Sequence, residues 1–450
     1  MTDLPPSPVA PAERQLGLDV VRGLAVLGIL AMNIVEFGLP MRAYGDPSAA
    51  GGSTGADLCT WLVQEALFDG RMRALFSMLF GAGMVLIAER MQASDRGVST
   101  ADLLLRRCLW LIPLGIVHRF FLQWTGDILY IYGLLGVLAV GLRELRPRTQ
   151  LIAGLLALAM AGPLELRRYD VAATQRAQAA EAQAIEARGE KPAEELAQAA
   201  ARWQRRLEAP KPDADAAELK AIRGSWVDVA RFRWDHNHSF QHAFVYYYFV
   251  WDVLGMMLVG MALQRLGFFA GRMRTSVYAA AIVVGAAAAT TSWWLAQTWA
   301  ASSWSRGELG LQLARGSLYP FLRGFGGLGW AAVLLLALRS APLARLLQPL
   351  AAVGRTAFSC YILQTLCCTT FFFGWGCGWY GLLSRTQLML VFGAVSVVQL
   401  VFAVLWLRAF RFGPMEWLWR SLTYWHRQPL CREASPAAAA TPAATAPPSP

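Results

Sequence analysis

The chain has few charged residues. Of its 450 residues, 16% are Asp, Glu, Lys or Arg and 56% are hydrophobic, whereas soluble domains carry about 25% charged residues. Apolar runs long enough to cross a bilayer recur along the chain. The composition therefore excludes an ordinary soluble enzyme and indicates an integral membrane protein.

Several catalytic and binding motifs are also missing. There is no Gly-rich phosphate loop, no Gly-x-Ser-x-Gly turn around a serine nucleophile and no zinc signature. The seven cysteines lie mostly in apolar runs without Cys-x-x-Cys spacing. The run "DHNHSFQH" places His238 and His242 at the helical spacing of a metal pair, with His236 beside them, but no third and fourth ligand follow. We expect no metal site, so any reaction must use side chains that project from helices.

The chain also lacks the features of a removable signal peptide. Its first residues, "MTDLPPSPVAPAER", are Pro-rich and have no positive n-region. We expect no cleaved leader and a disordered N-terminus over residues 1–15.

Positive charge is present, and its distribution is informative. The net charge is +11, but the arginines lie in short segments between apolar runs, where they orient helices rather than bind nucleic acid. Arginines are denser in alternate loops and after the last run. The positive-inside rule then predicts an inner-membrane protein with both termini in the cytoplasm and the lipid bilayer as its environment.

Apolar runs closed by Arg, Gly or Pro predict an all-α, polytopic transmembrane helical bundle of about ten spans. Residues 16–166 hold the first five spans and residues 241–410 the last five. The expected spans are 20–39, 74–88, 108–122, 128–142, 151–164, 244–263, 277–301, 318–338, 358–373 and 388–407.

Three segments outside the spans have distinct compositions. Residues 167–240 are rich in Ala, Glu, Gln and Arg and predict a charged helical insert on the extracytoplasmic side, which is either functional or a spacer or lid without chemistry. Residues 411–427 combine Trp, Tyr and Arg and predict an interfacial cytoplasmic helix. Residues 428–450 are of low complexity and are expected to be disordered.

The first span carries polar residues on one face. Asp19 and Arg22 are three residues apart, and Asn33 lies eleven residues after Arg22, about three helical turns. Charged residues in a membrane helix are costly unless they pair or face the bundle interior. This face should therefore point inward, either to build a site or simply to join helices.

The same stretch, "LDVVRGLAVLGILAMN", resembles the first helix of the membrane-bound acyltransferase superfamily, which includes the acyltransferase-3 enzymes and the heparan-glucosaminide acetyltransferases. The acyltransferase-3 pattern is Asp-Gly-x-Arg-Gly, with a functional His fourteen residues after the Asp. Here that position is Asn33, and the heparan-glucosaminide branch also has Asn there, in its active site.

A longer resemblance covers nearly the whole chain. The segments "FDGRMRALFSMLFGAGM", "LGIVHRFFLQWTGDILYIYGLLG", "GMMLVGMALQRLGFF", "GRTAFSCYILQT" and "FRFGPMEWLWRSLTYW" are similar to the YeiB-like bacterial family, domain of unknown function 418. Membership implies a multi-pass membrane protein with an acyltransferase-like fold.

One His and one Asp flank a predicted hairpin. His118 ends the third span and Asp127 begins the fourth, so both are expected at the extracytoplasmic rim. A His oriented by a carboxylate can act as general base in acyl transfer, and Asn33 can stabilise the developing negative charge. The alternative is a structural His, with Asp127 capping its helix.

This sequence departs from the superfamily in one respect. The resemblance places a catalytic His near the outer end of the first span, and "NIVEFGLPMRAY" contains none. Either His118 has taken over that role or the fold has lost the reaction.

Further polar residues are candidates for substrate binding. Arg71 and Arg73, on the outer side against the charge rule, can bind an anionic glycan or lipid headgroup with Asp69, or pair with neighbours. Arg323 is an intramembrane charge that needs a partner. In the ninth span, Ser359, Tyr361 and Gln364 line a cavity or join helices.

The donor of an acyl transfer would be acyl-CoA, approaching from the cytoplasm. Its phosphates need cations, and Arg106 and Arg107 are candidates, although the charge rule requires such arginines anyway. The first hypothesis is acyl transfer to an extracytoplasmic glycan or lipid. The alternatives are a transporter or flippase of a small amphiphile, and a non-catalytic membrane scaffold.

Overall fold

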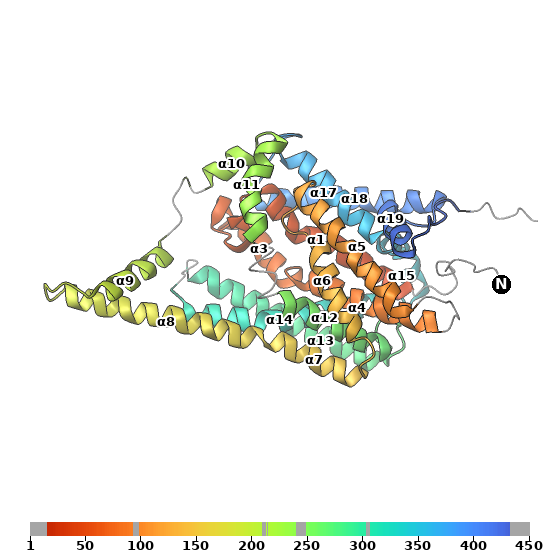
Figure 1. Ribbon diagram of the computed structural model, residues 1–450, viewed down its shortest axis with the longest axis horizontal. Coiled ribbons are helices and arrows are strands. Elements are labelled where there is room, and N and C mark those ends of the chain that lie inside the picture. Colours follow the sequence, from red (N-terminus) through yellow and green to blue (C-terminus); the bar gives the residue numbers. More distant parts are fainter. Residues whose placement is uncertain are drawn as a thin grey trace, which may run out of the picture.

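The structure, a computed structural model, describes residues 16–92, 99–208, 213, 215–239, 249–302 and 307–432. Within these ranges the regular elements are helices, and the sole β pairing is an isolated bridge between Phe410 and Cys431. The expected helical bundle is therefore confirmed (Figure 1). Residues 1–15, residues 433–450 and the three His of "DHNHSFQH" lie outside the residues whose side chains are described.

Each of the ten expected spans overlaps a helix. The corresponding helices are α1 (Leu16–Gly38), α4 (Arg71–Gln92), α5 (Thr100–Phe120), α6 (Leu129–Gly141), α7 (Pro147–Ala159), α12 (Val250–Arg265), α13 (Thr275–Ala301), α14 (Leu309–Ala337), α17 (Ala357–Phe372) and α18 (Arg385–Ala409). In the described residues, six helical segments are long and apolar enough to cross a membrane, and α6 and α17 are shorter apolar helices. The chain is a multi-pass membrane protein.

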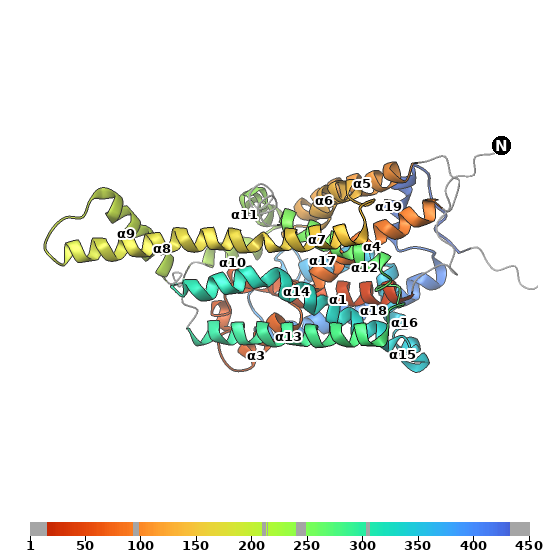
Figure 2. The ribbon, with the colours of Figure 1, turned by 90° about the horizontal axis from the view of Figure 1, so that it is seen from below.

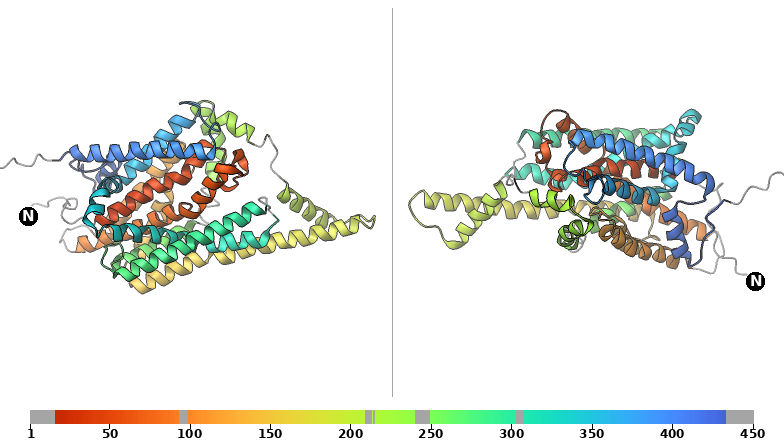
Figure 3. Two further views of the ribbon diagram at one scale, coloured as in Figure 1. Left: turned by 180° about the vertical axis from the view of Figure 1, so that it is seen from behind. Right: turned by 90° about the horizontal axis from the view of Figure 1, so that it is seen from above.

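Helix α1 lies at the centre of the bundle. It contacts α4, α14, α17 and α18, and also the short helix α16 (Gln348–Arg355) (Figure 3). In its apolar window 72% of the residues are buried, against 22% in α13 and in α18. Apolar side chains that stay exposed on the outer helices, such as Val283 and Leu390, suit a surface that faces lipid.

One helical region of the bundle is interrupted by a break. Helix α3 (Gly55–Leu67) is followed at once by α4, with a break over residues 68–70. Helix α4 then packs against α12, where Gly81 and Gly260 bring the two backbones together: a Cβ on either would lie about 2 Å from a carbonyl oxygen of the other helix. Helix α3 was not expected, because Asp57, Gln64 and Glu65 interrupt its apolar pattern.

The fifth span and the charged insert are not separated at residue 166. Helices α7 and α8 (Ala161–Glu186) follow each other with a break only at Met160, and α8 projects far beyond the bundle with α9 (Glu194–Leu207) folded back along it (Figures 1 and 2). A helix ends where its backbone is no longer helical, and alanine-rich polar sequence continues a helix as readily as apolar sequence does. The composition changes here, but the helix does not end.

The rest of the insert returns to the bundle. Helices α10 (Ala216–Ile222) and α11 (Trp226–Ser239) lie across the ends of α1, α5 and α17. Arg42, in the short helix α2 (Arg42–Gly45), pairs with Asp215 at 2.6 Å, and this hydrogen bond raises the pKa of the Arg42 guanidinium. The backbone N–H of Gly374 donates to the carbonyl of Ile222 at 2.9 Å. On which side of the membrane this cover lies stays a prediction.

The predicted interfacial segment contains helix α19 (Pro414–Tyr424), which follows α18. The Glu416 carboxylate accepts hydrogen bonds from the backbone N–H of Phe358 at 2.6 Å and of Ser359 at 3.2 Å, and from the Ser359 hydroxyl. Glu416 thus caps the N-terminus of α17, where the first N–H groups have no helical partner. Burial raises the pKa of Glu416, while these hydrogen bonds act to lower it.

We expect Glu416→Ala to destabilise the protein by about 1–3 kcal/mol, because it leaves buried N–H groups of α17 without an acceptor. Glu416→Gln, which keeps one acceptor oxygen, should lose less. The measurement is thermal unfolding of the detergent-purified protein. The matched control is Glu144→Ala, because Glu144 is largely exposed and pairs only with its neighbour Arg143, so its loss should stay within about 0.5 kcal/mol. Equal losses at the two sites would contradict the capping role.

Candidate functional site

The bundle contains a cavity of about 660 Å³, a size that accommodates a small organic ligand. Its walls come from α1, the start of α4, the start of α6, the junction of α7 and α8, the start of α12 and the middle of α14. Apolar side chains such as Met32, Met72, Ile131 and Phe249 form much of the lining.

The lining also contains charged groups of both signs. Four carboxylates and four guanidinium groups lie in the wall: Glu36, Asp127, Glu165, Asp252, Arg73, Arg168, Arg315 and Arg323. Charged residues between the helices of a membrane protein are costly and often mark substrate or ion sites.

His118 and Asp127 form a buried pair beside this cavity. His118 Nδ1 lies 2.7 Å from Asp127 Oδ1, and His118 Nε2 lies 2.9 Å from the Thr365 hydroxyl. Both side chains are at most 1% exposed. Asp127 lines the cavity, while His118 lies behind it. A ligand in the cavity would therefore meet Asp127 rather than His118.

The backbone around Asp127 holds the carboxylate in place. Its Oδ1 also accepts the N–H of Leu129 at 3.2 Å, and its Oδ2 accepts the N–H of Tyr130 at 3.0 Å, so Asp127 caps α6 while it binds His118. Asp127 therefore both caps α6 and orients His118, two roles that the sequence analysis treated as alternatives.

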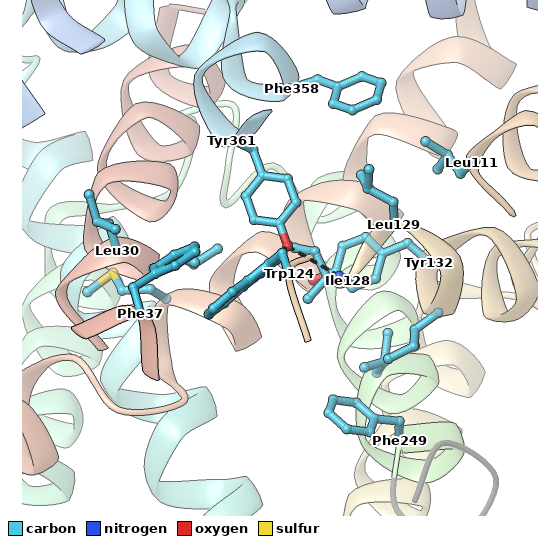
Figure 4. Packing of buried hydrophobic residues seen from close by; sticks show 14 of the residues in the cluster. Leu30, Phe37, Leu111, Trp124, Ile128, Leu129, Tyr132, Phe249, Phe358 and Tyr361 are labelled. Carbon is cyan, nitrogen blue, oxygen red and sulfur yellow. Dashed lines mark hydrogen bonds between the residues drawn. The ribbon is translucent and has the colours of Figure 1, made fainter. Parts of the chain in front are cut away.

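An aromatic group supports the pair from the other side. The Tyr361 ring lies edge-on to His118, with centroids 4.9 Å apart. Its hydroxyl accepts from Trp124 Nε1 at 3.2 Å and from the Ile128 N–H at 3.3 Å (Figure 4). Trp124 in turn stacks on Phe37 of α1, with centroids 3.8 Å apart. These contacts fix the loop between α5 and α6 against α1 and α17.

The pair is covered by other parts of the protein. Thr365, its partner, is halfway along α17 and fully buried, and α11 covers the turn between α5 and α6 through a hydrogen bond from Gln123 Nε2 to the Trp226 carbonyl. The hairpin ends inside the protein because the insert folds back over it. Local sequence carries no signal for that long-range contact.

The polar residues of α1 separate into two groups. Asn33 lines the cavity, as does Glu36 one turn later, which accepts a hydrogen bond from Thr125. Asp19 and Arg22 pair with each other at 3.3 Å near the start of the helix and do not line the cavity. On this face of α1, Asp19 and Arg22 form an ion pair away from the cavity, and Asn33 and Glu36 line it.

Arg71 and Arg73, the two arginines predicted on the outer side, also differ. Arg71 points away from the cavity, where its guanidinium donates to the Glu65 carbonyl at 2.7 Å and to the Ser292 hydroxyl at 2.7 Å. Arg73 lines the cavity and lies 3.6 Å from Asp252 of α12. Arg323 also lines the cavity and pairs with the other oxygen of Asp252.

The remaining candidates lie outside the cavity lining. Ser359 bonds to Glu416 and to the N–H of Met415, and so joins α17 to α19. Gln364 is fully buried, and no described residue is a hydrogen-bond partner of its amide.

The two proposed donor-binding arginines lie at the start of α5, against the C-terminal segment. Arg106 pairs with Asp102 and lies over the ring of Trp425, and Arg107 lies over the ring of Trp419. These contacts give both guanidinium groups partners within the protein.

Sequence reasoning missed Glu36, Asp252 and Thr365. The first two are carboxylates inside apolar runs, and the rule for intramembrane charges that selected Arg323 would have found them. Thr365 gives no such signal, because a threonine in a membrane helix usually bonds to its own backbone.

The fold and the cavity define a class: a multi-pass helical membrane protein with a charged internal cavity. The chain belongs to the DUF418 family. That family, described as "Protein of unknown function (DUF418)", matches residues 263–426. Similarity to relatives over nearly the whole chain confirms the resemblance to the YeiB-like family.

The similar proteins are bacterial. The chain is 30% identical over 427 residues to the uncharacterized protein YeiB of Escherichia coli, covering 91% of this chain and 96% of YeiB. It is 29% identical over 448 residues to the uncharacterized protein YxaH of Bacillus subtilis, covering 95% and 98% respectively. No solved structure matches the chain significantly.

Gly70, in the break between α3 and α4, tests how tightly the cavity wall is built. Its φ of +62° is left-handed, and a Cβ there would lie 2.5 Å from the Tyr319 hydroxyl and 2.9 Å from Arg323 Cδ. We expect Gly70→Ala to cost about 2–4 kcal/mol in thermal unfolding, because backbone strain and overpacking add.

The control for Gly70→Ala is Gly83→Ala in α4. A Cβ at Gly83 meets nothing within 4 Å, so alanine should be neutral or stabilise the helix by up to about 1 kcal/mol. If Gly70→Ala does not lower the unfolding temperature, the backbone between α3 and α4 can shift to accommodate a side chain, and the predicted strain is absent.

Proposed function

We propose that the protein is a membrane-embedded acyltransferase that moves an acyl group from acyl-CoA to a hydroxyl or amine of an extracytoplasmic glycan or lipid bound in the cavity. The observation that carries this proposal is the buried Asp127–His118 pair, whose carboxylate faces a cavity of substrate size. The superfamily resemblance of the first helix supports the reaction class.

In the proposed reaction the Asp127–His118 pair accepts the proton of the attacking hydroxyl as one unit. Asp127 Oδ2 accepts only one hydrogen bond in the described structure, from Tyr130 N–H, which leaves a lone pair for a substrate proton. The hydroxyl oxygen then bonds to the thioester carbonyl carbon, the carbon–sulfur bond breaks, and the thiolate of CoA takes up the proton. The Asn33 amide donates a hydrogen bond to the carbonyl oxygen as its charge grows.

We expect His118→Gln to lower transfer about 10²–10⁴-fold, because general-base catalysis contributes that factor. The measurement is incorporation of labelled acetyl groups from acetyl-CoA into the lipid and glycan fractions of membrane vesicles that contain the protein. The control is His426→Gln, because His426 is exposed near the end of α19. Unchanged transfer by folded His118→Gln protein would show that His118 is not the catalytic base.

The donor is tested separately. Acetyl-CoA should raise the unfolding temperature of the purified protein, by about 2.7 kcal/mol of stabilisation at a hundredfold excess over its Kd. Free adenosine nucleotides serve as controls, and Arg106→Gln with Arg107→Gln should weaken the effect. No stabilisation by acetyl-CoA or by longer acyl-CoAs would remove the donor from the proposal.

A transporter or flippase of a small amphiphile is the second candidate. The observation that favours it is the break between α3 and α4 at the cavity, since broken helices frame the substrate sites of many transporters. Movement of a solute into vesicles without chemical change, and without acyl incorporation, would select this function.

A further inference from the structure

Arg73 and Arg323 share a single carboxylate in the cavity wall. Both guanidinium groups pair with one carboxylate, that of Asp252, at its two different oxygens. The Arg323 side chain is 3% exposed, and its Nε has no hydrogen-bond partner among the described residues. A buried guanidinium with an unsatisfied N–H is costly and calls for a further acceptor.

The other carboxylates of the cavity wall have partners of their own. Asp127 binds His118, Glu36 accepts from Thr125, and Glu165 pairs with Arg168 at 3.3 Å.

Two more carboxylates lie near the wall without lining the cavity. Glu65 pairs with Arg315 at 3.4 Å. Asp69 accepts from the Tyr44 hydroxyl at 3.5 Å, and its charge acts on Arg71 and on Arg323. Among the described ion pairs, Asp252 is the one carboxylate within 4 Å of Arg73 and Arg323. Residues 240–248, which precede α12, have no Asp or Glu in their sequence.

The shared carboxylate, the unpartnered Nε of Arg323 and the position of both guanidinium groups favour an anion in the cavity. Gly70, Met72 and Arg73 of the first turn of α4 line the wall, and the N-terminus of a helix adds partial positive charge there. Arg323 reaches this turn because Gly70 has no side chain. Next to these groups the wall is apolar, with Met32, Ile131 and Phe249.

We propose that Arg73 and Arg323, sharing Asp252, form a binding site for the head of an anionic amphiphile such as a lipid phosphate, with its apolar chain along the Met32, Ile131 and Phe249 wall. The inference names the substrate class of the cavity and so rests on the proposed function, or equally on its transport alternative. Arg73 and Arg323 act in binding and orientation, and Asp127 lies in the same cavity.

The test uses the full chain in phosphatidylcholine nanodiscs, titrated with dodecyl phosphate. Tryptophan fluorescence reports occupancy, because Trp251 lies in the cavity wall. We expect dodecyl phosphate to bind at least tenfold more tightly than dodecanol or inorganic phosphate. Arg73→Gln should weaken binding at least tenfold, since a charge-assisted hydrogen bond is lost. Arg73→Lys should recover part of it.

Asp252→Asn gives an effect of opposite sign. Without the competing carboxylate, both arginines are free for the ligand, so dodecyl phosphate should bind several-fold more tightly although the protein becomes less stable. Arg339→Gln is the matched control, because Arg339 is bound to Thr275 and to the carbonyl of Met273 outside the cavity. Its affinity should be that of the unaltered protein.

Two results would overturn the inference: equal affinity for inorganic phosphate and dodecyl phosphate, or unchanged affinity in both Arg73→Gln and Asp252→Asn. Failure of the proposed function looks different. In that case dodecyl phosphate binding still depends on Arg73, but no acyl incorporation occurs in any variant. Conversely, acyl transfer that depends on His118, with dodecyl phosphate binding independent of Arg73, would keep the function and reject this substrate class.

Discussion

The constraint on which the rest of the structure depends is that charges inside a membrane protein must find partners within the protein. The ion pairs of Arg73 and Arg323 with Asp252 join α4, α12 and α14 around one cavity, and the Asp127–His118 pair joins α6 to α5. Apolar packing alone does not fix how such helices meet, because lipid solvates apolar side chains equally well. The buried polar groups therefore specify both the arrangement of the helices and the place of the candidate site.

The same constraint explains the interrupted helical region α3–α4 at the cavity. A break in a membrane helix exposes backbone groups that must be satisfied inside the protein. At the α3–α4 break the Arg71 guanidinium donates to the carbonyls of Glu65 and Asp69, so a charged side chain replaces the missing helical hydrogen bonds. Arg71 is thus needed to build the wall, and Arg73, two residues later, is left to face the cavity.

Much of the fold was predictable from sequence. Runs of apolar residues identified ten segments that are helical, and the Trp- and Arg-rich segment after the last run contains a helix. The prediction failed for α3, whose polar residues face neighbouring helices: Gln64 donates to the Ala31 carbonyl, and Asp57 accepts from Ser384 and Thr386. A hydropathy pattern scores such residues as unfavourable, because it does not include the partners that satisfy them. At the start of the insert the composition changes within helix α8, so composition alone does not mark where a helix ends.

The sequence by itself determined that this is a helical membrane protein of the DUF418 family, and it identified His118, Asp127, Asn33, Arg73 and Arg323 as polar residues in an apolar setting. Only the tertiary structure decided how they are grouped. It placed Asp127 between the cavity and His118, paired His118 with Thr365 of a helix almost 250 residues away, and gave Arg73 and Arg323 one shared carboxylate in Asp252. Spacing along one helix fixes which residues share its face, but contacts between helices depend on the packing of the whole bundle.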